Sequence, residues 1–127
     1  MIFTIKIKTN FSAAHNLKEV GGKCENLHGH NFTVEVAVES PELNGQGMVM
    51  DFRLLKAKTE AVLASLDHRY LNDLPVFQDK NPSAENLAAY IFAELSRQIE
   101  AGPLRLSSVS VWESETSQAT YQGPTHD

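Results

Sequence analysis

Three histidines have the spacing of a metal site. His28 and His30 are separated only by Gly29, and residues two apart on an extended strand point to the same side. His15 ends an alternating stretch that we expect to lie beside that strand, so a third imidazole can approach the pair. Three imidazoles with one open position are typical of catalytic zinc, whereas closed structural sites use four protein ligands. We predict zinc at His15, His28 and His30; the alternative is ordinary polar histidines at a strand end.

Cys24 is the only cysteine of the chain and precedes His28 by four residues. It could be a fourth metal ligand, a buried structural thiol, or a reactive base or nucleophile. Its neighbours Lys23, Glu25 and Asn26 are polar, which argues against an apolar slot. A thiol near a dication is also partly thiolate at neutral pH. We therefore favour the reactive role for Cys24.

Asp67 and His68 are adjacent at the expected end of a helix. A carboxylate beside an imidazole fixes its tautomer and raises its basicity, as a proton shuttle requires. A histidine that interacts with the dipole at a helix C-terminus is the alternative, and the pattern alone does not separate the two.

Glu113 shares the strand parity of Val109 and Val111, so its carboxylate should point to the apolar face. A buried carboxylate is costly without a partner. A ligand with two adjacent N–H donors, such as an amidine or guanidine edge, would supply one. The alternative is that the alternation ends before Glu113 and leaves it exposed.

Alternation of apolar and polar residues predicts the strands that carry these side chains. Residues 3–11, which run on toward His15, and residues 30–39 alternate and are expected to pair as a long hairpin-like unit. Residues 109–113 predict another strand, and residues 119–122 a short final one. These four strands would form one antiparallel sheet with a solvated face.

Two amphipathic stretches predict helices. Asp51 can cap a helix that begins at Phe52, with Phe52 on its apolar stripe, and that ends near residues 67–68. A second helix starts at residues 81–83 with Ser83 as its cap, and Gly-Pro stops it at residues 102–103. The element order predicts an α+β fold with both helices on one face of a four-stranded antiparallel sheet.

Composition places these elements in a single domain, residues 1–127, with 42% hydrophobic and 21% charged residues. The net charge of −5 argues against nucleic acid or an anionic membrane as partner. We expect no membrane span, no signal peptide and, with one cysteine, a reducing cytoplasmic location. Residues 123–127 are expected to fray, and His126 among them has no expected role.

Six motifs in order resemble those of the 6-pyruvoyl-tetrahydropterin synthase family, and most closely its carboxy-forming branch in the queuosine pathway. The resemblance extends from Phe11 to about Tyr121. The motifs are Phe11-Ser-Ala-Ala-His15, Cys24-Glu-Asn-Leu-His28-Gly-His30-Asn31, Met50-Asp51-Phe52, Leu66-Asp-His-Arg-Tyr-Leu-Asn72, Asn81-Pro-Ser-Ala-Glu-Asn86 and Val111-Trp-Glu113.

The resemblance implies a role for each candidate residue. In the implied site His15, His28 and His30 hold one zinc ion per subunit, Cys24 is the general base, and Asp67 and His68 are an acid/base pair. Glu113 is a catalytic residue that also anchors the pterin, and Ser83 is a second substrate-binding residue. Ser83 stands where the family more often has threonine, so packing there would differ.

The resemblance also implies the tunnelling fold, in which subunits assemble into a barrel, usually a hexamer built as a dimer of trimers. Active sites would then lie at subunit interfaces. The implied reaction converts 7,8-dihydroneopterin triphosphate to 6-carboxy-5,6,7,8-tetrahydropterin, acetaldehyde and triphosphate. The three residues between Cys24 and His28 favour this branch. The alternatives are a pyruvoyl-forming synthase of pterin cofactor biosynthesis and a non-catalytic zinc- or pterin-binding protein of the same fold.

Overall fold

The computed structural model describes residues 1–123, except for the side chains of Lys23 and Cys24; residues 124–127, and His126 with them, lie outside the described residues. The elements are β1 (Phe3–His15), η1 (Gly22–Glu25), β2 (His28–Ser40), α1 (Phe52–Leu63), η2 (Leu71–Asp73), η3 (Pro75–Phe77), α2 (Ala84–Ile99), β3 (Arg105–Ser114) and β4 (Ser117–Gln122).

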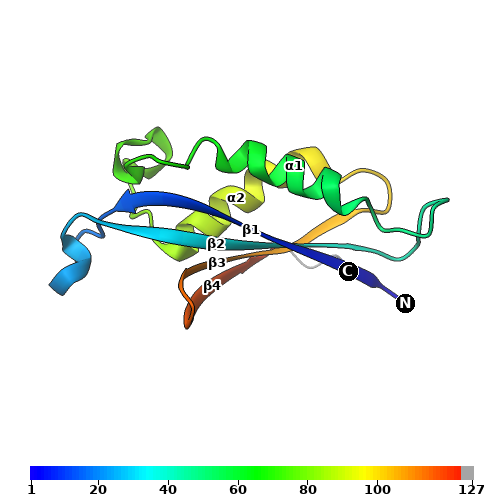
Figure 1. The fold of residues 1–127 in the computed structure, drawn as a ribbon, viewed down its shortest axis with the longest axis horizontal. Helices are drawn as coiled ribbons and strands as arrows, with labels where there is room; N and C mark the ends of the chain where they lie inside the picture. Colours follow the sequence, from blue (N-terminus) through cyan, green and yellow to red (C-terminus); the bar gives the residue numbers. More distant parts are fainter. Residues whose placement is uncertain (124–127) are drawn as a thin grey trace.

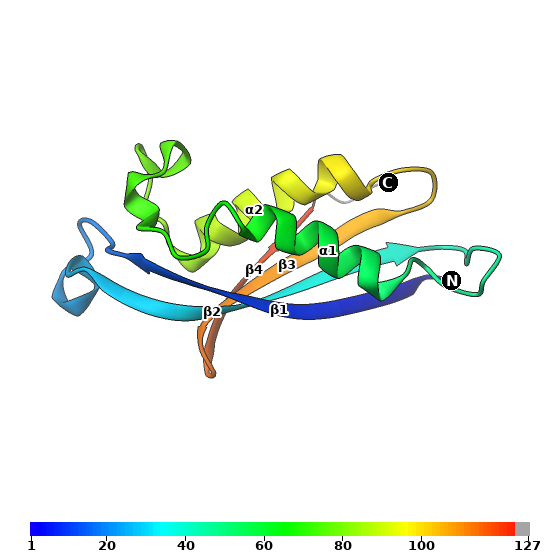
Figure 2. The same ribbon diagram turned by 45° about the horizontal axis from the view of Figure 1, so that its top comes forward.

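The four strands form one sheet in the order β1-β2-β3-β4, and each neighbouring pair is antiparallel. Both long helices cover the same face of this sheet, as two views of the ribbon show (Figures 1 and 2). The predicted α+β class, with its four-stranded antiparallel sheet and two helices on one face, is therefore confirmed.

The pairing of β1 with β2 sets the geometry of one end of the molecule. The two strands pair without a register shift from Phe3 opposite Ser40 to His15 opposite His28. The last residue of β1 thus faces the first residue of β2. The predicted hairpin-like unit is confirmed, and two of the candidate ligands lie at its closed end, where residues 16–27 connect the two strands.

The core lies between the helices and the covered face of the sheet. Alternate residues of β2 (Phe32, Val34, Val36 and Val38) are fully buried, which is the parity that also includes His28 and His30. The helices contribute fully buried side chains to the same core: Leu55 from α1 and Leu87, Ile91 and Leu95 from α2. His28 and His30 therefore lie on the same face of β2 as these core residues, at the end of the strand that is nearer to solvent.

Both helix caps form as predicted. Asp51 Oδ1 accepts a hydrogen bond from the backbone N–H of Arg53 at 2.7 Å, and Ser83 Oγ accepts one from the N–H of Asn86 at 3.2 Å.

No helix within residues 1–123 has the length and apolar character needed to cross a bilayer.

The predicted end of the first helix, near residues 67–68, is wrong. The helix α1 ends at Leu63, and the following chain turns toward the edge of β1. There the N–H of residue 68 donates to the carbonyl of Ser12 at 2.6 Å, and the N–H of Ala14 donates to the carbonyl of Arg69 at 3.0 Å. Residues 64–67 form turns whose N–H groups still donate to carbonyls three or four residues back, and the pairing with β1 begins at residue 68. Helical periodicity does not reveal where this change occurs.

Other expectations need smaller corrections. Phe52 is not on a buried stripe, because it is 54% exposed at the first turn of α1. The second strand begins at His28, two residues early, and β3 begins at Arg105 rather than near residue 109. Residues 71–77 hold the two short turns η2 and η3 where a plain loop was expected.

Two adjacent leucines of α1 test this placement of the helix. Leu55 is fully buried and Leu54 is 50% exposed. We expect Leu55→Ala to lower the free energy of unfolding by about 2–5 kcal/mol. The matched control Leu54→Ala should cost less than about 1 kcal/mol. Urea unfolding of the two variants measures the difference, and equal losses would contradict the orientation of α1.

Candidate metal centre

Three imidazoles meet where β1 ends and β2 begins. Their ring centroids lie 4.6 Å apart for His15 and His28, 5.2 Å for His15 and His30, and 4.8 Å for His28 and His30. One nitrogen from each ring can be chosen so that all three lie within 4.8 Å of one another. Nitrogens at about 2.0–2.1 Å from a tetrahedral ion lie about 3.3 Å apart, so modest side-chain rotations would complete the site.

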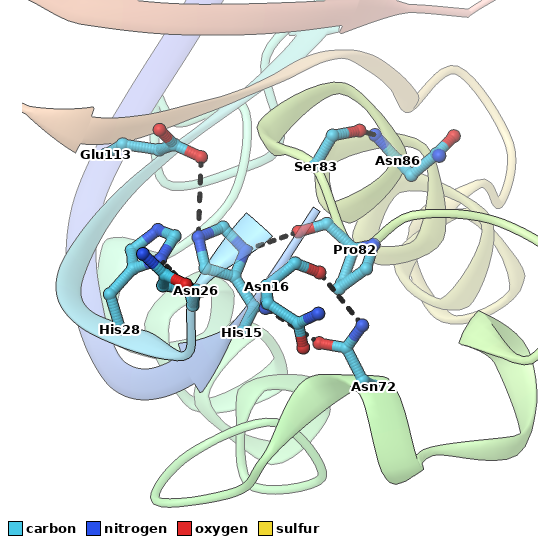
Figure 3. Close-up of polar contacts among 9 residues, drawn as sticks. All are labelled: His15, Asn16, Asn26, His28, Asn72, Pro82, Ser83, Asn86 and Glu113. Atoms are coloured by element: carbon cyan, nitrogen blue, oxygen red, sulfur yellow. Dashed lines mark hydrogen bonds and ion pairs between the residues drawn. The ribbon is translucent and has the colours of Figure 1, made fainter. Parts of the chain in front are cut away.

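His15 is held from the helical layer. Its ring is fully buried, and its Nδ1 lies 2.7 Å from the carbonyl oxygen of Pro82, just before α2 (Figure 3). A carbonyl oxygen only accepts hydrogen bonds, so Nδ1 carries the proton and Nε2 presents a lone pair. Burial lowers the pKa of His15, which keeps the imidazole neutral at neutral pH.

The Nε2 atom of His15 lacks a partner. Among the described residues it is the one buried side-chain nitrogen or oxygen without a hydrogen bond. It faces Oε1 of Glu113 at 3.8 Å (Figure 3). The lone pair of His15 Nε2 and the Glu113 carboxylate opposite it would both be stabilised by a positive charge between them. An unsatisfied buried acceptor such as Nε2 costs about 1–3 kcal/mol. A cation between the imidazoles would satisfy His15, so the residues fit a metal ion.

His28 is oriented by a similar contact. Its Nδ1 lies 2.7 Å from the carbonyl oxygen of Asn26, so this ring too has its lone pair on Nε2.

Phe32 meets both His15 and His30 edge-on, with ring centroids 5.4 Å apart in each case. The buried phenyl ring forms the dry inner wall of the cluster, and such surroundings control how water reaches a metal.

Glu113 points where its parity predicted. Its side chain is 31% exposed and turned toward His15, so the alternative of a fully exposed Glu113 is wrong. The register of β3 with β4 shifts between Trp112 and Ser114, at the position of Glu113. Glu113 and Ser83 line one cavity of about 210 Å³ beside α2. The structure thus brings together the two residues expected to contact a ligand.

Asp67 and His68 form the expected pair. Nδ1 of His68 lies 3.0 Å from Oδ2 of Asp67, while Oδ1 of Asp67 accepts the backbone N–H of Ser12 at 2.9 Å. That N–H, with His68 second, lowers the pKa of the Asp67 carboxyl. His68 lies beyond the last residue of α1, Leu63, and its ring contacts the Asp67 carboxylate.

The pair lies outside the three-histidine cluster. The side chains of Asp67 and His68 are 42% and 81% exposed, at the outer edge of β1. His68 has a φ of 58°, which turns the chain sharply here. It lines an open groove of about 510 Å³ together with His30 and Ser12. Within one subunit the pair therefore faces outward from the edge of the sheet.

Cys24 lies in η1, in the connection between β1 and β2. Its side chain is outside the described part of the chain, so its chemical role stays a prediction. The connection places its backbone at the same end of the sheet as His15 and His28.

Several contacts of the site could not be found from residue types. The carbonyl groups of Pro82 and Asn26 orient two rings, yet any residue can supply a carbonyl. Phe32 did carry a signal, because it continues the parity of His28 and His30 along β2.

The cluster predicts selective loss of metal binding. Replacing His28 or His30 by alanine should weaken binding of Zn²⁺ or Co²⁺ by more than about 100-fold, because loss of an outer partner alone costs 10- to 100-fold. The control His68→Ala removes a histidine outside the cluster and should bind the metal as the wild type does. Competition titrations of the metal-free protein measure these affinities; equal affinity in all variants would exclude this site.

The sequence is similar to those of known proteins along most of its length. The family model described as 6-pyruvoyl tetrahydropterin synthase matches residues 4–124. A "6-carboxy-5,6,7,8-tetrahydropterin synthase" from Synechocystis is 45% identical over 91% of this chain and 89% of that protein. A "dihydroneopterin monophosphate aldolase" from Pyrococcus furiosus is 39% identical over 84% of this chain and 85% of its own length.

The fold is shared as well as the sequence. The structure of Caenorhabditis elegans 6-pyruvoyl tetrahydropterin synthase superposes with a TM-score of 0.83 and 32% identity, covering 98% of this chain and 97% of that one. The family model spans almost the whole sequence, including the three clustered histidines and Glu113. The chain belongs to the 6-pyruvoyl tetrahydropterin synthase family, whose tunnelling fold it has.

Proposed function

We propose that the protein is a zinc-dependent carbon–carbon lyase of queuosine biosynthesis. It would convert 7,8-dihydroneopterin triphosphate to 6-carboxy-5,6,7,8-tetrahydropterin, acetaldehyde and triphosphate. The observation that carries the proposal is the unpartnered Nε2 of His15, buried among two further imidazoles and facing Glu113. The 45% identity to a carboxytetrahydropterin synthase supports the choice of reaction.

His15, His28 and His30 would hold the zinc, with an open position left for the substrate. When bound, zinc would supply Lewis acidity to the hydroxyl groups of the substrate side chain. The chain contributes the preset tautomers: in the neutral rings of His15 and His28 the Pro82 and Asn26 carbonyls hold the proton on Nδ1, so Nε2 carries the lone pair. Neither ring then has to change its tautomer when the ion binds.

Glu113 would anchor the pterin ring. The 2-amino group and N3–H of a pterin present two parallel donors, which match a carboxylate. Glu113 is 31% exposed and lines a cavity with Ser83, so this contact would be partly shielded from water. The Oγ of Ser83 accepts the cap hydrogen bond, which leaves its own proton for a ligand.

Proton transfer would be divided between Cys24 and the pair formed by Asp67 and His68. Cys24 would act as the general base beside the metal. Asp67 is ionised at neutral pH and accepts Nδ1–H of His68, so Nε2 of His68 is the atom that takes or gives a proton.

The outward position of His68 supports an active site shared between subunits. Its ring is 81% exposed at the edge of β1 and is not part of the three-histidine cluster of its own subunit. In a homo-oligomer, which we propose to be a hexamer built as a dimer of trimers, an adjoining subunit would cover this edge. A base used as a free thiol also suits a reducing compartment, so we place the protein in the cytoplasm.

Two relatives define the alternatives to be tested. The C. elegans structure is that of a 6-pyruvoyl tetrahydropterin synthase, and the P. furiosus relative acts, by its name, on a monophosphate. The zinc-loaded protein should be incubated with 7,8-dihydroneopterin triphosphate and, separately, with the monophosphate. Acetaldehyde and the 6-carboxy product from the triphosphate are expected; a pyruvoyl product, turnover of the monophosphate alone, or no turnover would each overturn the proposal.

A second prediction concerns the anchor. Glu113→Gln should lower kcat/KM by about 10- to 100-fold, because a hydrogen bond to a charged group is worth about 1.5–3 kcal/mol. The control Glu115→Gln removes a nearby carboxylate that is exposed at the turn into β4 and should keep full activity. Steady-state kinetics with both variants measure the effect, and equal kinetics would contradict the role of Glu113.

A further inference from the structure

Two asparagines, Asn72 and Asn81, bind the backbone of the segment that follows β1. Each side-chain amide uses its oxygen as an acceptor and its NH₂ group as a donor. Asn72 Oδ1 accepts the N–H of Asn16 at 3.0 Å, and its Nδ2 donates to the carbonyl of Asn16 at 2.9 Å. Asn81 does the same at Lys18, with 2.8 Å for the acceptor bond and 3.0 Å for the donor bond. Residues 16 and 18 are two apart, so their amides face the same direction, as in a strand.

These contacts begin where the sheet stops. The ladder between β1 and β2 ends at His15 and His28. On the other edge of β1, the segment after α1 pairs with Ser12 and Ala14. The two side-chain amides extend this second edge over Asn16 and Lys18, because each amide offers one donor and one acceptor as a peptide group does.

Each asparagine is itself fixed to the helical layer. Asn81 immediately precedes Pro82, whose carbonyl orients His15, and the carbonyl of Asn81 accepts Nδ2 of Asn86 at 2.7 Å. Asn72 lies in η2, and its carbonyl accepts Nε2 of Gln78 at 2.9 Å. The close-up shows the Asn72 contact with Asn16 beside the His15 ring (Figure 3).

We infer that Asn72 and Asn81 are positioning residues for the metal ligand His15. They hold the backbone on its C-terminal side, while the sheet holds it on the N-terminal side. With the backbone held on both sides, the His15 ring stays within reach of the Pro82 carbonyl when no ion is present. The same contacts set the direction of the connection that leads to Cys24. This inference rests on the proposed metal site and not on the identity of the reaction product.

Metal affinity of folded variants tests the inference. Asn72→Ala and Asn81→Ala should each weaken Zn²⁺ binding about 10- to 100-fold, the usual effect of losing an outer-shell contact. Asn81→Asp keeps the acceptor of Lys18 N–H but loses the donor to the Lys18 carbonyl, so its affinity should fall between those of the wild type and Asn81→Ala. The control is Asn44→Ala, which also loses two hydrogen bonds to the backbone, from Gln46 and Met48, at the far end of β2.

Asn44→Ala should bind Zn²⁺ with an affinity within about twofold of the wild type, even if it loses as much thermal stability as the Asn72 and Asn81 variants do. If Asn72 and Asn81 variants fold, lose stability and keep wild-type affinity, the residues are merely structural and the inference is wrong. If the wild type itself binds no Zn²⁺, the proposed metal site fails first. The two failures are thus distinguishable.

Hydrogen exchange of the metal-free wild type gives a test that needs no variant. The amide protons of Asn16 and Lys18 should exchange slowly, because both donate to side-chain oxygens. Exchange at the rate of an unprotected loop would overturn the inference even if every variant failed to fold.

Discussion

The hydrogen bond from Nδ1 of His15 to the carbonyl of Pro82 is the contact on which the rest of the site depends. It joins the last residue of β1 to the residue before the cap of α2, and so ties the sheet to its helical cover. Because the ring is fully buried, the bond also decides which nitrogen carries the proton. The opposite nitrogen is left as a dry lone pair, which is what a metal ion needs.

The other elements place partners around that lone pair. The unshifted pairing of β1 with β2 sets His28 directly opposite His15, and the two-residue period of β2 brings in His30. Glu113 enters from β3 at the point where the register with β4 changes. On the edge of β1, the Asp67 carboxylate accepts the N–H of Ser12, and the N–H of His68 donates to the Ser12 carbonyl. The strand β1 therefore contributes to both parts of the proposed site. Its residue His15 points to the metal, and its free edge binds Asp67 and His68 at the proposed subunit interface.

Residue types and their periods were enough to predict much of this arrangement. The spacing of His28 and His30 and the parity of Glu113 are local patterns, and strands preserve them. The end of α1 was predicted wrongly because the chain there pairs with Ser12, far away in the sequence. Phe52 was placed on the wrong face because an apolar residue at helical spacing does not reveal which side is covered.

Backbone groups were beyond the reach of sequence patterns. The carbonyls of Pro82 and Asn26 have no signature in a residue type, although they choose the tautomers of His15 and His28. Asn72 and Asn81 were visible only as members of motifs. Their function depends on two segments, residues 16–18 and 72–81, that meet only in the folded chain.

X-ray absorption at the zinc edge, on metal-free protein loaded with one equivalent of Zn²⁺, tests the central claim most directly. The account predicts three imidazole nitrogens at about 2.0–2.1 Å with one oxygen, and no sulfur, since Cys24 is kept as a base. A sulfur ligand at about 2.3 Å, or fewer than three imidazoles, would contradict it.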